Sequence, residues 1–136
     1  MQELITGTNS PAKPIMFETH QFNETLDKEF LMENYDTQEY LVEVFGDFLA
    51  LMPEEIQEIR AGQAEGDKDK VVKKIHAISS AVGFVGGTEL SDQMKRFEVK
   101  AKNDPDFDIT NEESTALINQ LDAFIGIIKE EHEQLS

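Results

Sequence analysis

Apolar side chains recur every three or four residues along most of this chain, which is the spacing of one face of an α-helix. The longest such pattern begins at about Thr37 and continues past Pro53 without a change of phase. A proline inside a helix removes one hydrogen bond and bends the axis. We therefore expect one kinked helix that reaches about Ala64. Its broad apolar face is made of Leu41, Val44, Phe45, Phe48, Leu49, Met52, Ile56 and Ile59.

The same spacing predicts three further long helices and a short leading one. One long helix begins near Val71, one follows Gly87, and one runs to about Gln134, while the short helix covers residues 23–34. The inward residues of the three long helices are Val71, Ile75, Ile78, Val82 and Val85; Leu90, Met94, Phe97 and Ala101; and Leu117, Leu121, Phe124, Ile125, Ile128 and Leu135.

Polar residues that favour helix starts lie at the expected boundaries. Their side chains can accept hydrogen bonds from the free N–H groups of a first helical turn. Two of them, Asp36 and Thr110, are followed three residues later by glutamate, which is the pattern of a capping box. The predicted capping residues are Asn23, Asp36, Asp67, Thr88 and Thr110.

The connections between the predicted long helices are short. Gly62 and Gly66 mark the first turn, Gly86 and Gly87 the second, and residues 103–108 form a loop. Short connections favour antiparallel neighbours. We therefore expect an all-α fold, an up-down-up-down antiparallel four-helix bundle with a short additional N-terminal helix. Residues 1–18 are predicted to be a flexible N-terminal arm, and residues 19–136 to form the bundle.

The charge of the chain excludes several classes of partner. There are 28 Asp and Glu residues against 12 Lys and Arg, a net charge of −16. Non-specific binding to nucleic acid or to an anionic membrane needs a surplus of Lys and Arg, so we expect neither partner. Mutual repulsion favours a monomer. With no cysteine, no signal-peptide pattern and no apolar run of about 20 residues, we expect a cytoplasmic protein without disulfides.

Three histidines are the candidates for side-chain chemistry. We expect His20, in the arm, and His132, among C-terminal glutamates, to be ordinary solvated residues. A metal site at His132 would need a second nitrogen ligand at helical spacing, which the sequence lacks. We therefore expect no metal and no cofactor. The chain also contains no nucleophile elbow and no Walker-type phosphate loop.

His76 differs from the other two because it lies about 140° around its helix from the apolar stripe. Val72, Ser79, Ser80 and Gly83 share its side one turn away, and all are small or short. An unperturbed imidazole is substantially neutral at pH 7 and therefore nucleophilic. No residue nearby is an evident base or oxyanion hole, so His76 would accept a group that another protein activates.

A wider pattern begins at this histidine. A hydrophobic residue lies two positions on, small residues follow, and a hydrophobic-Gly-Gly turn leads to a leucine; these are His76, Ile78, Ala81, Val85, Gly86, Gly87 and Leu90. The pattern resembles the signature of histidine-containing phosphotransfer (HPt) domains, in which an alanine stands where Gly87 stands here. The resemblance covers roughly residues 30–134 and includes Gly66-Asp67 and the acidic, proline-containing helix around residues 45–59.

The resemblance implies a phosphorelay intermediate of two-component signalling. A receiver-domain aspartyl phosphate would pass to His76 and on to a second receiver's aspartate, or back. The receiver, with its bound Mg²⁺, would supply the electrostatic catalysis, so the chain itself would be a phosphocarrier and not an enzyme. Receivers, and a hybrid histidine kinase as a further candidate, would be its partners. The implied docking residues are Val72, Lys73, Ser79, Ser80 and Gly83.

Ser79 and Ser80 depart from the family, which has a Lys-Gly pair there. In the family the lysine would compensate the phosphoryl charge, and the glycine would give the partner space. Lys73, one turn before His76, is a candidate substitute for that lysine. The departure keeps a second interpretation open, a non-phosphorylated adaptor that binds a receiver or another signalling partner through the same face. A metal- or ligand-binding bundle is disfavoured, because the inward stripes are nearly all apolar.

Overall fold

The structure, a computed structural model, describes residues 18–136, and this part of the chain contains five α-helices and no strand. The prediction of an all-α fold is confirmed for these residues. The predicted arm lies outside them except for its last residue, Glu18. The helices are α1 (Lys28–Asn34), α2 (Gln38–Glu65), α3 (Lys68–Phe84), α4 (Thr88–Asn103) and α5 (Glu112–Leu135).

Helix α2 continues through Pro53 for 28 residues, so the prediction of a single helix is confirmed. Its buried residues before and after the proline belong to one face, and their burial outweighs the hydrogen bond that the proline cannot make. Gly66 ends the helix in the left-handed conformation, with φ +70°, which favours glycine. Gly62, predicted to lie in the turn, is instead buried within α2 against Val71 of α3.

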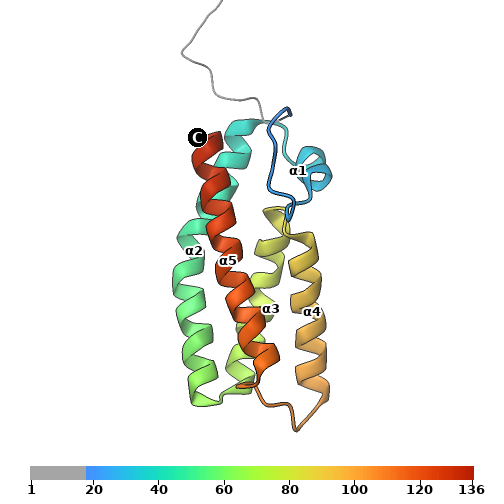
Figure 1. Ribbon diagram of the computed structural model, residues 1–136, viewed down its shortest axis with the longest axis vertical. Helices are drawn as coiled ribbons and strands as arrows, with labels where there is room; N and C mark the ends of the chain where they lie inside the picture. Colours follow the sequence, from blue (N-terminus) through green and yellow to red (C-terminus); the bar gives the residue numbers. More distant parts are fainter. Residues whose placement is uncertain (1–17) are drawn as a thin grey trace, which may run out of the picture.

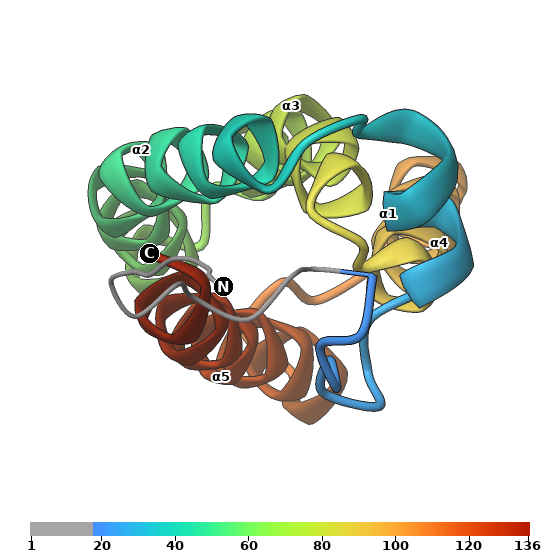
Figure 2. The same cartoon turned by 90° about the horizontal axis from the view of Figure 1, so that it is seen from above.

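The four long helices lie side by side (Figure 1), and Figure 2 looks along them. Helix α3 packs between α2 and α4, and α2 also packs against α5. Each long helix contributes fully buried side chains to a shared interior, among them Phe45, Ile75, Met94 and Leu121. This arrangement leaves the outer side of α3 and α4 facing solvent, and that side contains His76.

The segment around α1 closes one end of the bundle. The backbone N–H of Asp27 donates to the carbonyl of Gly86 at 2.8 Å, and the Tyr35 hydroxyl donates to the carbonyl of Phe84 at 2.7 Å. Gly86 has φ +93°, and a Cβ there would lie 3.1 Å from a methyl group of Leu31. The turn between α3 and α4 therefore needs glycine both for its backbone conformation and for its contact with α1.

Only one predicted helix cap, Asp67, is correct, and the others are shifted. The observed N-caps are Asp27, Thr37, Asp67, Gly87 and Asn111. At α2 and α5 the cap is the residue immediately after the predicted one, because two adjacent residues can both cap and the backbone selects the second. Asn23 instead accepts a hydrogen bond from Thr25 in a turn, so α1 begins later than predicted. Thr88 is the first residue of α4, and its hydroxyl donates to Asp27.

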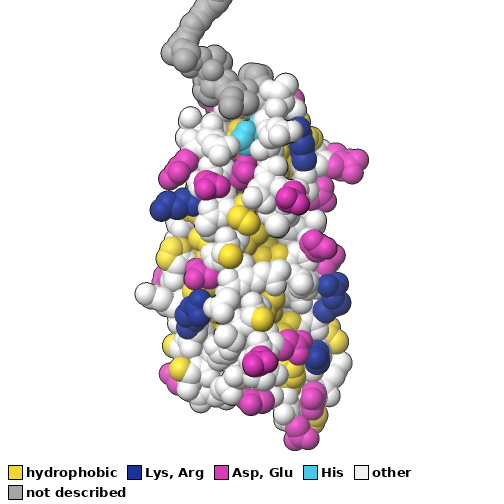
Figure 3. Space-filling model, viewed as in Figure 1, with side chains coloured by type: hydrophobic (Ala, Val, Ile, Leu, Met, Phe, Trp, Pro, Cys, Tyr) yellow, Lys and Arg dark blue, Asp and Glu magenta, His cyan; other side chains and the backbone are white. Residues whose placement is uncertain are grey.

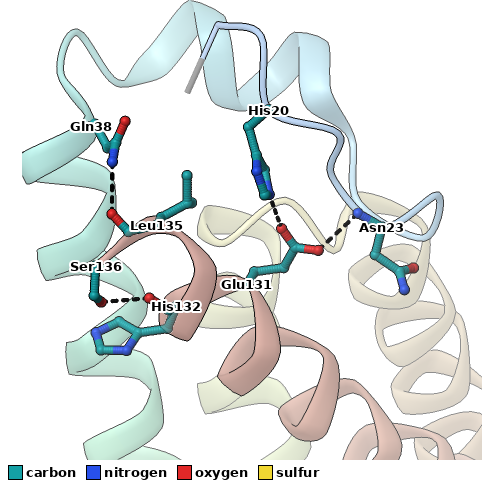
Figure 4. Close-up of polar contacts among 7 residues, drawn as sticks. All are labelled: His20, Asn23, Gln38, Glu131, His132, Leu135 and Ser136. Carbon is teal, nitrogen blue, oxygen red and sulfur yellow. Dashed lines mark hydrogen bonds and ion pairs between the residues drawn. The ribbon is translucent and has the colours of Figure 1, made fainter. Parts of the chain in front are cut away.

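The prediction that His20 is a solvated residue is wrong. Its side chain is 3% exposed, and its Nε2 lies 2.6 Å from Oε1 of Glu131, a buried residue of α5 (Figure 4). The other oxygen of Glu131 accepts the backbone N–H of Asn23 at 3.0 Å. Glu131 thus fixes the segment before α1 to the end of α5. The sequence did not indicate this burial because His20 precedes the first residues with helical spacing.

Candidate functional site

Helix α3 turns His76 outward. Its neighbours Ile75 and Ile78 are buried in the core, whereas the His76 side chain is 69% exposed. The prediction that this imidazole faces solvent is confirmed. The ring is therefore accessible to another protein, although its backbone belongs to a helix packed on both sides.

One edge of the ring is held by a carboxylate from the neighbouring helix. Nδ1 of His76 lies 2.9 Å from both oxygens of Glu98 on α4. The Glu98 side chain is only 10% exposed, so it approaches the ring from the protein side. Its Oε2 also accepts a hydrogen bond from Nζ of Lys102, one turn further along α4, at 2.7 Å. The three side chains form a linked group, His76–Glu98–Lys102.

Opposing effects set the pKa of Glu98. Burial favours the neutral acid and raises the pKa of the Glu98 carboxyl. Hydrogen bonds and charge from Lys102 and His76 act in the opposite direction and prevail, so the pKa of Glu98 lies below its usual value of 4.5. Glu98 is therefore a carboxylate at neutral pH.

The ionised state of Glu98 determines where the imidazole hydrogen lies. A carboxylate can only accept hydrogen bonds, so Nδ1 of His76 must be the nitrogen that donates. In the neutral ring the lone pair is then on Nε2, the nitrogen on the far side from Glu98. The geometry offers solvent an oriented nucleophile.

Small residues allow α3 and α4 to approach closely enough for this contact. The Ser91 hydroxyl of α4 donates to the carbonyl of Ser79 at 2.8 Å, and the Ser79 hydroxyl donates to the carbonyl of His76 at 2.9 Å. A Cβ at Gly83 would lie 3.4 Å from the Ser91 hydroxyl. Close approach of the two helices at these residues brings Glu98 within hydrogen-bonding distance of His76.

The predicted docking residues divide into two groups. Val72 and Ser79 are buried, so the prediction that they share the exposed side of His76 is wrong. Val72 belongs to the hydrophobic core, and Ser79 contacts Ser91 of α4. Lys73 and Ser80 are exposed, and Gly83 is half-buried. Within residues 18–136 no ion pair involves Lys73, and no hydrogen bond joins its side chain to His76.

Sequence reasoning missed Glu98 and two exposed apolar residues. Phe84 and Val99 are both 58% exposed. Phe84 lies eight residues after His76 and therefore on the same side of α3, and Val99 follows Glu98. The available signal for Glu98 was its position between Met94 and Ala101, at helical spacing within an apolar stripe, where a charged residue needs a partner. Nothing in the sequence identified that partner.

Neither His132 nor the surface hollow between α4 and α5 belongs to the group formed by His76, Glu98 and Lys102. His132 is half-buried on α5. Within residues 18–136 no group of three or more His, Asp and Glu side chains is placed to hold a metal ion. A hollow of about 340 Å³ lies between α4 and α5, where apolar side chains show along the middle of the face in Figure 3. Phe97, Leu117 and the Lys100–Glu113 ion pair line it, and His76 does not.

A family model for the Hpt domain matches residues 43–126, which include both His76 and Glu98. The chain belongs to the Hpt domain family. Hpt domains are phosphocarriers of two-component signalling that interact with receiver domains and histidine kinases in phosphorelays, so the resemblance seen in the sequence is confirmed. No curated protein and no solved structure matches the chain. No helix of residues 18–136 has the length and apolarity needed to cross a membrane.

Proposed function

We propose that this Hpt domain is a phosphorelay intermediate that carries a phosphoryl group on Nε2 of His76 between receiver-domain aspartates. The supporting observation is the exposed imidazole whose Nδ1 is occupied by Glu98, because that contact leaves Nε2 as the nucleophilic nitrogen. Ser80 and Gly83 beside the ring would leave room for the partner's phosphoaspartate. Phe84 and Val99 would be covered by the partner's surface.

The transfer step is a displacement at phosphorus. The lone pair of Nε2 forms the N–P bond while the P–O bond to the aspartate breaks, and its electron pair returns to the aspartate carboxylate. No hydrogen needs to leave Nε2, since the ring hydrogen is on Nδ1. The ring becomes more positive as the N–P bond forms, and Glu98 faces that charge. Mg²⁺ on the receiver would neutralise the phosphoryl oxygens.

The proposal also includes the helix order of the bundle, its oligomeric state and its compartment. The up-down-up-down order of the four long helices is supported by the short connections that follow α2 and α3. A monomer in the cytoplasm would present its single His76 to receivers, and to a hybrid histidine kinase, in turn. The chain would bind no cofactor of its own.

Labelling tests the proposal directly. The full chain is incubated with receiver domains of the same cell after these have been charged with radiolabelled acetyl phosphate. We expect label on the wild-type chain, none on His76→Gln, and full label on the control His132→Gln. Label retained by His76→Gln would refute the site.

One observation favours a second candidate, a non-phosphorylated adaptor that binds a receiver through the same face. The residue at the family's lysine position, Ser79, is buried and uncharged, so no cation comes from that position. Acid-labile phosphate on the chain would exclude this candidate. Receiver binding without any transfer of label would support it.

A further inference from the structure

Three lysines are candidates to act on Glu98, and the structure distinguishes them. Lys102 contacts Oε2 of Glu98 at 2.7 Å, whereas Lys73 has no ion-pair partner among the described residues. Lys74, also near His76 in sequence, is bound by Glu55 and Glu58 of α2, at 3.2 Å and 2.7 Å. Lys102 is therefore the cation that is placed to act on the phosphoacceptor group.

A carboxylate without a second cation works against the nucleophilicity of an imidazole beside it. It stabilises the charged imidazolium, in which both nitrogens carry hydrogen and neither has a lone pair. Glu98 is mostly buried, so solvent screens its charge poorly. A histidine held in that way would be oriented but not nucleophilic. A second cation on the carboxylate offsets the effect, because the charge of Glu98 is then already balanced.

We propose that Lys102 is a positioning residue for histidine phosphotransfer: it balances the charge of Glu98, so that Glu98 orients the His76 ring while the ring stays neutral and keeps a lone pair on Nε2. The inference rests on the proposed function of His76. This role differs from that of the family's lysine, which would compensate the phosphoryl charge from α3, because Lys102 compensates the carboxylate of Glu98. It acts through Glu98 and need not touch the phosphoryl group.

The charged groups around Glu98 are few. His76 faces it from α3, and Lys102 faces it from α4 itself. Within residues 18–136 no ion pair joins Glu98 to α2 or α5. Lys95, three residues before Glu98 on α4, is exposed and has no ion pair there, and Lys100 is paired with Glu113 of α5 at 2.8 Å. Lys100 and Lys102 are almost equally exposed, at 59% and 58%. Lys100→Met is therefore a matched control for Lys102→Met, with the same charge change on the same helix.

The test measures how the phosphorylation rate of His76 depends on pH. Phosphoramidate, a small phosphoryl donor to imidazoles, is used in place of a receiver, and ¹⁵N NMR of the ring reports hydrogen on each nitrogen. In Lys102→Met we expect the acid limb of the rate profile to move to higher pH by about half a unit to one unit, a three- to tenfold loss of rate on that limb. The rate at alkaline pH should be unchanged. Lys102→Arg should restore the profile, and Lys100→Met should match the wild type.

A double-variant cycle shows whether Lys102 acts through Glu98. Glu98→Gln retains an oxygen that can accept from Nδ1 but has no charge, so in that background Lys102→Met should no longer shift the profile. Coincident profiles for Lys102→Met and Lys100→Met would overturn the inference. So would a loss of rate that is equal at every pH. Phosphoramidate needs no receiver, so these outcomes are independent of whether a receiver transfers phosphate to His76.

Discussion

His20 and Glu131 form a buried pair that depends on both members. Glu131 has two partners in this site, the His20 ring and the backbone N–H of Asn23. Removing one member of a buried hydrogen-bonded pair leaves the other without compensation, which costs far more than losing a surface contact. The pair should therefore matter more to folding than any exposed ion pair of this molecule.

We expect His20→Ala to lower the free energy of unfolding by about 3 kcal/mol, because Glu131 would remain buried without its ring partner. Urea unfolding of the full chain measures the loss. The control is His132→Ala, which removes a half-buried ring from the residue next to Glu131 on α5. A loss below about 0.5 kcal/mol in His20→Ala, typical of surface positions, would contradict the burial of this pair.

Glu98 makes stability depend on pH with a definite sign. Its pKa in the folded chain is lower than the ordinary value of 4.5, because Lys102 and His76 outweigh the effect of burial. The unfolded chain therefore takes up a proton there more readily than the folded chain does. The stabilisation from Glu98 is present above pH 4.5 and is lost as the pH falls through the folded-state pKa.

The corresponding prediction compares the wild type with Glu98→Gln. The difference in their free energies of unfolding should be larger at about pH 6 than at about pH 3.5, because the stabilisation from the Glu98 carboxylate declines as the pH falls below 4.5. Urea unfolding at the two pH values provides the measurement. Glu130→Gln, an exposed substitution on α5, should show little difference at either pH. A constant difference for Glu98→Gln would mean that the folded chain does not favour its carboxylate.

The turn between α3 and α4 is the element that sets the position of Glu98 relative to His76. At Gly87 an added Cβ would lie 2.5 Å from the ring of Phe124 and 2.9 Å from a methyl group of Val82. Neither neighbour is the free end of a flexible chain, so the turn would have to move. At Gly126, an exposed position within α5, an added Cβ would have nothing within 4 Å.

Two glycine substitutions should therefore act in opposite directions. Gly87→Ala should destabilise the chain by about 1–3 kcal/mol through overpacking. Gly126→Ala should stabilise it by about 0.5–1 kcal/mol, since alanine favours the helix. Thermal unfolding of both variants is sufficient to compare them. Equal effects of the same sign would show that the turn is not tightly packed.

The helices and their inward faces were predictable because periodicity is a local property. The apolar stripes of α2 to α5 were identified from spacing alone, and the turn at Gly66-Asp67 follows from residue types with strong preferences. The caps of α2 and α5 were displaced by one residue, since adjacent residues compete for that position. Local patterns therefore indicate that a helix exists better than they indicate its first residue.

The site was only half predictable, for a different reason. The exposure of His76 follows from its own helix, but its partner Glu98 comes from another helix 22 positions along the chain. Val72 and Ser79 were assigned to the exposed side by a helical wheel that does not show where a neighbouring helix lies. His20 was wrongly predicted to be solvated because it precedes the first residues with helical spacing. In each case the missing information was tertiary packing.

Charge is unevenly divided over the whole molecule. Helices α3 and α4 contain eight of the 12 Lys and Arg residues. Helices α2 and α5 contain 13 of the 28 acidic residues but only two basic ones, Arg60 and Lys129. A field of this kind orients an approaching partner and changes its association rate more than its final affinity. The side that presents His76 is the less negative one.

Two charge reversals test whether this division matters for docking. Lys95 lies on α4 and Lys129 on α5, and both side chains are exposed. The substitutions Lys95→Glu and Lys129→Glu change the total charge by the same amount. With a receiver that labels the chain, Lys95→Glu should lower the association rate by about threefold at low salt, and Lys129→Glu should have little effect. Stopped-flow measurement over a range of salt concentrations is the readout. Equal slowing in both variants would mean that only total charge counts.

The folded unit is wider than the stretch by which the family is recognised. The match over residues 43–126 begins after buried Leu31, Tyr35 and Leu41 and stops before buried Ile128 and Leu135. An expression clone trimmed to that match would lack both residues of the buried His20–Glu131 pair. It would also leave apolar faces of α2, α3 and α5 uncovered. Clones meant for crystallisation or NMR should therefore keep everything from Glu18 to Ser136.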